Sequence, residues 1–136
     1  MNRQFVLTMI VIAGVFAGAT AFAQHRPYDQ VMKDVGATFA SLRKNLDGNS
    51  AAAAVEDAAK LEGLFKETEA FWAPFNTKDA LNFAKGAREA ATAVGTAAKG
   101  GDVKAAQESY ARIQKNCAGC HFSHREETGK GFLIKP

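Results

Sequence analysis

Several features are scarce in this sequence of 136 residues. It contains only two cysteines, and its β-branched residues are few and spread out. After residue 23, no stretch alternates apolar and polar residues with a period of two for long enough to make a strand, which argues against a β-sheet fold. The 17 Lys and Arg residues are scattered among 14 Asp and Glu residues without forming a basic run. A nucleic-acid-binding protein is therefore not indicated.

One long apolar run is present, at residues 5–22, directly after M-N-R-Q. Arg3 and the free amine make its start positive, and A-F-A at 21–23 fits the small-x-small cleavage pattern of a secretory signal peptide. An uncleaved membrane anchor is the alternative, because the run just reaches the ~17–25 residues that span a bilayer. The glycines and the cleavage pattern favour removal of residues 1–23, which leaves 24–136 as a single domain. We therefore expect a periplasmic or otherwise exported protein with no stable membrane insertion after cleavage.

Turn-forming residues divide the remaining chain into four segments of about twenty residues, each long enough to make a helix of ~30 Å. The breaks fall at 46–50, 72–77 and 99–102. We expect the first helix to start near Pro27 and to end at Gly48 in a left-handed cap. Expected N-caps of the other three helices are Ser50, Thr77 and Asp102. Because such short connections force neighbouring helices to be antiparallel, the sequence predicts an all-α, up-down-up-down four-helix bundle.

Apolar residues recur at helical spacing within each segment and predict its buried face. In the last segment this face carries Val103, Ala106, Tyr110, Ile113 and Cys117. The third segment offers mostly alanine to the core, and alanine side chains alone bury little area. A bundle of this length would therefore be stabilised by a large apolar ligand in its interior.

Both cysteines lie in the stretch C-A-G-C-H at 117–121. Cys117, Cys120 and His121 are spaced i, i+3 and i+4, so a helix places them on one face, pointing into the bundle. A structural zinc site needs four protein ligands, and a fourth would have to come from His25 or His124. A thioredoxin-like pair needs a βαβ unit, which is absent, whereas a simple disulfide is compatible with an oxidising compartment.

The remaining interpretation is covalent haem. Two thiols at this spacing can add to the two vinyl groups of one porphyrin edge, while the adjacent imidazole binds the iron, and Cys-x-x-Cys-His is the pattern of c-type haem attachment. Export, the use of both cysteines and a core that lacks large side chains favour this interpretation. We expect one covalently attached haem c in the bundle core.

The chain also resembles the class II c-type cytochromes, the cytochrome c-prime family. The resemblance rests on an exported four-helix layout with C-A-G-C-H near the C-terminus, on residues 101–121, and on V-M-K-D-V-G at 31–36. It implies that Cys117 and Cys120 form the thioethers and that His121 is the proximal iron ligand. It further implies that Arg125 fills a basic position, where it would contact a propionate or the haem. A homodimer formed through a helix face would also resemble much of the family.

The chain departs from the family pattern at two places. His124 stands where the family usually has an aromatic residue, and we expect it to be a partly exposed polar residue at a helix end. Tyr28 and Asp29 stand where an Arg-Gln pair is frequent, so the usual propionate contacts are not expected. The sequence does not predict a position for the tail at 128–136.

The sixth iron position decides between two functions. Met32 matches the position of the ligand in low-spin, methionine-ligated members of the family, and this arrangement predicts a soluble electron-transfer protein that works with redox partner proteins. If Met32 only packs against the porphyrin, the iron is five-coordinate, which predicts a protein that binds nitric oxide or carbon monoxide. His25, near the expected mature N-terminus, is a less favoured ligand. No distal acid–base residue can be placed, so we do not expect an enzyme.

Overall fold

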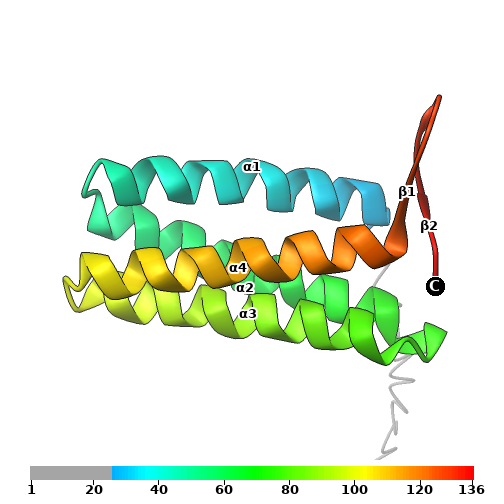
Figure 1. Ribbon diagram of the computed structural model, residues 1–136. Helices are drawn as coiled ribbons and strands as arrows, with labels where there is room; N and C mark the ends of the chain where they lie inside the picture. Colours follow the sequence, from blue (N-terminus) through cyan, green and yellow to red (C-terminus); the bar gives the residue numbers. More distant parts are fainter. Residues whose placement is uncertain (1–25) are drawn as a thin grey trace, which may run out of the picture.

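Four helices form the body of the computed structural model, which describes residues 26–136. They are α1 (Tyr28–Asp47), α2 (Ala51–Trp72), α3 (Lys78–Lys99) and α4 (Val103–His124), and a single 3₁₀ turn, η1 (Ala73–Phe75), follows α2 (Figure 1). Consecutive helices are antiparallel, which confirms the predicted all-α, up-down-up-down bundle. The predicted signal peptide and His25 lie outside the described residues.

The helix ends follow the predicted boundaries, although not every expected cap is made. The carboxylate of Asp102 accepts a hydrogen bond from the Ala105 amide at 2.9 Å, as an N-cap should. Ser50 and Thr77 also occupy N-cap positions, but neither hydroxyl caps its helix. The prediction for Gly48 was wrong, because Gly48 has φ −86° and the left-handed conformation falls on Asn49, with φ 53°. Asparagine tolerates this conformation better than most residues, so the turn is made one position later.

The core is built mainly from small side chains. In α3 the buried residues are Val94 and alanines alone, which agrees with the predicted alanine-rich interior. The largest fully buried side chains of the molecule lie elsewhere, and they include Trp72, Leu42, Leu61 and Ile113. Val103 was wrongly predicted to face inward, since it begins α4 at the end of the bundle and is 41% exposed.

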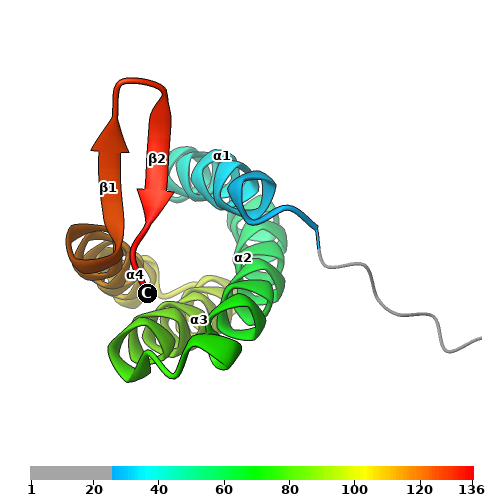
Figure 2. The ribbon, with the colours of Figure 1, turned by 90° about the vertical axis from the view of Figure 1, so that its right-hand side faces the viewer.

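The four helices do not pack equally against one another. Extensive contacts join α1 to α2, α2 to α3 and α3 to α4, whereas α1 and α4 touch along only a small part of their length. One contact between them is the stacked pair Phe39 and Tyr110, with ring centroids 4.2 Å apart. Seen from one end, α1 and α4 are the neighbours with a space between them (Figure 2). The site described below opens in this part of the bundle.

A short β-hairpin follows α4 and was not predicted. Strand β1 (Arg125–Thr128) pairs antiparallel with β2 (Gly131–Ile134), with Arg125 opposite Ile134 and Thr128 opposite Gly131. The Thr128 hydroxyl donates to the Gly131 carbonyl at 2.8 Å and stabilises the turn. Figure 2 shows the hairpin beside the space between α1 and α4. Within residues 26–136, no helix is both long enough and apolar enough to cross a membrane.

Candidate functional site

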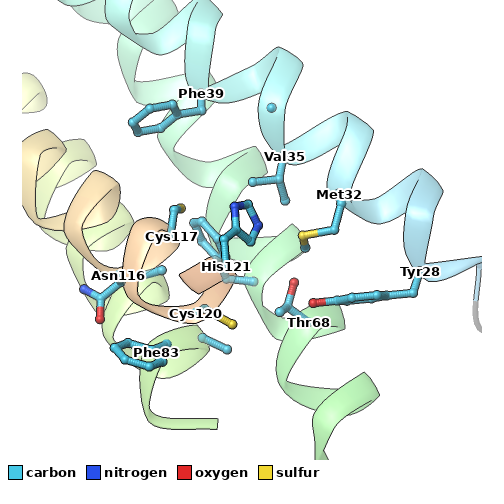
Figure 3. A pocket seen from close by; sticks show the side chains of 14 residues that line it. Tyr28, Met32, Val35, Phe39, Thr68, Phe83, Asn116, Cys117, Cys120 and His121 are labelled. Atoms are coloured by element: carbon cyan, nitrogen blue, oxygen red, sulfur yellow. The ribbon is translucent and has the colours of Figure 1, made fainter. Parts of the chain in front are cut away.

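A cavity of about 160 Å³ lies between α1 and α4, with α2 and α3 forming its other walls. Its lining is almost wholly apolar. Side chains from all four helices contribute, including Tyr28, Met32, Val35, Phe39, Phe65, Thr68, Phe83, Ala84, Ala87, Asn116, Cys117, Cys120 and His121 (Figure 3). The predicted thioether cysteines, the predicted proximal histidine and the predicted sixth ligand thus line one cavity.

The α4 wall carries the C-A-G-C-H stretch. Cys117, Cys120 and His121 are half-buried on the cavity side of the helix, and both cysteines are free thiols. Gly119 lies against α3, where a Cβ atom would come within 2.6 Å of the Phe83 ring. Glycine at this position therefore leaves room for the Phe83 ring of α3 to pack against α4.

The α1 wall faces these groups from the opposite side. Met32 is half-buried, and Val35 lies one turn further along the helix. Figure 3 shows the imidazole of His121 reaching from α4 toward Val35 and the sulfur of Met32. A histidine nitrogen and a thioether sulfur thus lie on facing walls, and both atom types can bind a transition metal.

Burial controls the protonation of these groups. It raises the pKa of Cys117 and of Cys120 to about 11, so both are neutral thiols at pH 7. A reactive or redox-active cysteine needs a lowered pKa, and the raised values disfavour a reactive dithiol. Burial, with a smaller effect of the Arg125 charge, lowers the pKa of His121. The imidazole is therefore neutral and keeps a lone pair free to bind a metal.

One end of the cavity is closed by an aromatic group centred on Tyr28. Its ring stacks on Phe71 with centroids 3.7 Å apart, and the buried indole of Trp72 donates a hydrogen bond to its hydroxyl at 3.0 Å. Burial raises the pKa of Tyr28 to about 12, so the phenol is neutral. Phe83 was expected to pack in the core or against the haem, and it lines the cavity. Tyr28 was noted only as a departure from the family pattern, and no role was expected for Asn116. Spacing could have indicated both residues, because Tyr28 precedes Met32 by four residues and Asn116 precedes Cys117 by one.

His124 is the clearest error among the expected side chains. It is 8% exposed rather than partly exposed. Its Nδ1 bonds the Lys135 carbonyl at 2.8 Å, and its Nε2 bonds the Asp79 carboxylate at 2.9 Å. Burial is possible because both ring nitrogens find acceptors, one from α3 and one from the C-terminal tail. Arg125 lies at the same end of the cavity, with its guanidinium 4.1 Å from the centre of the Phe132 ring; its predicted haem contact stays a prediction.

The cavity presents two thiols, one imidazole and one thioether as atoms that could hold a metal or a cofactor. In residues 26–136, no group of three or more His, Cys, Asp or Glu side chains is arranged to hold a metal ion. The cavity is of the size that accepts a molecule like benzene, for which ~150 Å³ suffices. A porphyrin is larger than this cavity, so holding one would require the lining side chains to move.

Comparisons of the chain with protein-family models, with curated proteins and with solved structures returned no match.

Proposed function

We propose that this chain is an exported monohaem c-type cytochrome that transfers electrons. The observation that carries the proposal is a single apolar cavity lined by both thiols, by a neutral histidine and by a facing methionine. Each of these groups has a separate chemical role. Among the described residues, three of the four pairs of neighbouring helices pack extensively, and the cavity lies between α1 and α4, the pair that does not. A bound cofactor between α1 and α4 would complete the packing of the bundle.

The two thiols would hold the haem by addition. Cys117 and Cys120 would each hold the haem through a thioether, and because a thiol adds its sulfur and its hydrogen across the vinyl double bond, no oxidant would be needed. His121, adjacent to Cys120, offers the neutral lone pair required of a proximal ligand. The haem would supply one-electron chemistry, and the apolar walls would exclude water and set its potential.

Met32 is the proposed sixth ligand, and with it the iron would have two protein ligands. Ligand exchange is then blocked, which suits electron transfer between redox partner proteins. The partner proteins are unidentified, and export to a periplasm or its equivalent is part of the proposal.

Covalent attachment is tested on the chain expressed with c-type maturation machinery. We expect one haem per chain to stay bound after denaturation, with the spectrum of a doubly thioether-linked haem. Replacing only Cys117 or only Cys120 by serine should leave the haem attached through one thioether. The other vinyl group then stays unsaturated, and the absorption spectrum of the haem should shift accordingly. Replacing both should abolish retention, and retention in the double variant would contradict the proposal.

Gas binding is the second candidate, because the cavity already provides space next to the His121 imidazole. The two functions differ in the response of the reduced protein to carbon monoxide. For electron transfer we expect no spectral change in the unaltered protein and a shifted Soret band in Met32→Ala. Val35→Ala, on the same wall and without a metal-binding atom, is the matched control. A carbon monoxide response in the unaltered protein, unchanged by Met32→Ala, would support gas binding instead.

A further inference from the structure

The C-terminal hairpin forms a wall of the site at the end where α1 and α4 separate. A second void, of about 30 Å³, is lined by Ile134 of β2 together with Tyr28, Met32, Cys120 and His121. The last four of these residues also line the central cavity, so Ile134 covers the end of that cavity. A strand that follows the helix bearing the haem motif thus returns to the residues that would surround the iron.

The strand is held there by contacts with the end of α4. The Lys135 amide donates to the His124 carbonyl at 2.9 Å, and the Lys135 carbonyl bonds the ring of His124 at 2.8 Å. The opposite ring nitrogen bonds Asp79 at the start of α3, and the ring lies 5.0 Å from that of buried Trp72. Both ring nitrogens of His124 therefore have a hydrogen-bond partner, one on the C-terminal tail and one on α3.

Adjacent residues of β2 differ in what they touch. Ile134 lines the void and is 40% exposed, whereas Leu133 is 59% exposed and lines neither cavity. Successive side chains of a strand point to opposite faces, so Leu133 points away from the site. The two residues have the same number of side-chain atoms, and they therefore make a matched pair.

We propose that the hairpin is a strap closing the end of the haem cavity, in which Ile134 shields the haem edge from water and small reagents and His124 anchors the strand. The inference rests on the proposed haem function. With a haem in place, the strap limits electron exchange at this end to partners that displace or bypass it, and it also limits the entry of small ligands.

The test uses the full-length, haem-loaded chain. Ferric protein is mixed with dithionite, and the rate of reduction is recorded for Ile134→Ala, Ile134→Trp and Leu133→Ala. We expect Ile134→Ala to be reduced about threefold faster or more, with a lower midpoint potential, because a more solvated haem favours the ferric state. Ile134→Trp should be reduced more slowly, and Leu133→Ala should match the unaltered protein.

Equal rates for Ile134→Ala and Leu133→Ala would overturn the strap. The role of His124 in holding the strand is tested separately by hydrogen exchange. His124→Ala should accelerate exchange at the Lys135 amide and raise the rate of haem reduction. Slow exchange in His124→Ala would overturn the anchor. Covalently bound haem is measured first on each denatured sample, so failure of the cytochrome proposal is seen before any rate is compared.

Discussion

Gly119, the central residue of C-A-G-C-H, provides a sharp test of how α3 supports the site. In an open helix position, alanine in place of glycine stabilises a protein by ~0.8–1.0 kcal/mol. At Gly119 the added Cβ would lie 2.6 Å and 2.8 Å from two atoms of the Phe83 ring. Overpacking costs ~1–3 kcal/mol, and the cost falls in the lower part of this range here, because the contact is with the far end of the half-buried Phe83 side chain. After the gain from helix propensity is subtracted, we expect Gly119→Ala to lower the free energy of unfolding by up to ~1 kcal/mol.

Gly63 in α2 is the matched control, because a Cβ there meets nothing within 4 Å. Gly63→Ala should stabilise the protein by ~0.8–1.0 kcal/mol, and so the two alanine variants should differ in sign or nearly so. Urea unfolding followed by circular dichroism measures both. In a Phe83→Ala background the cost of Gly119→Ala should disappear, since the ring it meets is gone. If Gly119→Ala stabilises the protein as much as Gly63→Ala does, the Phe83 ring does not pack closely against Gly119.

Two further predictions concern the end of the cavity near the hairpin. Tyr28→Phe leaves the indole N–H of buried Trp72 without its acceptor and should lower the free energy of unfolding by ~1–3 kcal/mol. Tyr110→Phe loses only a long hydrogen bond of 3.4 Å and should lower it less. Equal costs for the two variants would contradict the role of the Tyr28 hydroxyl. The hydrogen bond from His124 lowers the pKa of Asp79 below its ordinary 3.8. The ionised Asp79 carboxylate therefore stabilises the fold fully at pH values above 3.8, and this stabilisation is lost as the pH falls through the lowered pKa. The stability difference between the unaltered protein and Asp79→Asn should therefore vanish in strong acid, and a difference that persists there would have another cause.

The order and approximate boundaries of the four helices could be predicted from the sequence alone. Helical spacing and turn residues predicted four helices and their order, and the i, i+3, i+4 spacing placed Cys117, Cys120 and His121 on one cavity wall. The location of the cavity did not follow from these rules. It depends on α1 packing against α2 rather than α4 along most of its length, which is a property of the assembled bundle.

The errors arose where distant contacts override local preference. His124 looks like a polar residue at a helix end, but its burial requires Asp79, 45 residues away, and the Lys135 carbonyl. The hairpin escaped prediction because its strands have four residues each and lack alternation over a useful length. At Gly48 and Asn49 both residue types permit a left-handed conformation, so the sequence alone does not decide which adopts it.

Retention of the pigment by the unfolded chain tests the central claim most directly. The protein, produced with c-type maturation machinery, is denatured, separated from free haem and assayed for haem iron and mass. The account predicts one haem per chain, lost only when Cys117 and Cys120 are both replaced. A colourless denatured chain with two free thiols would contradict it.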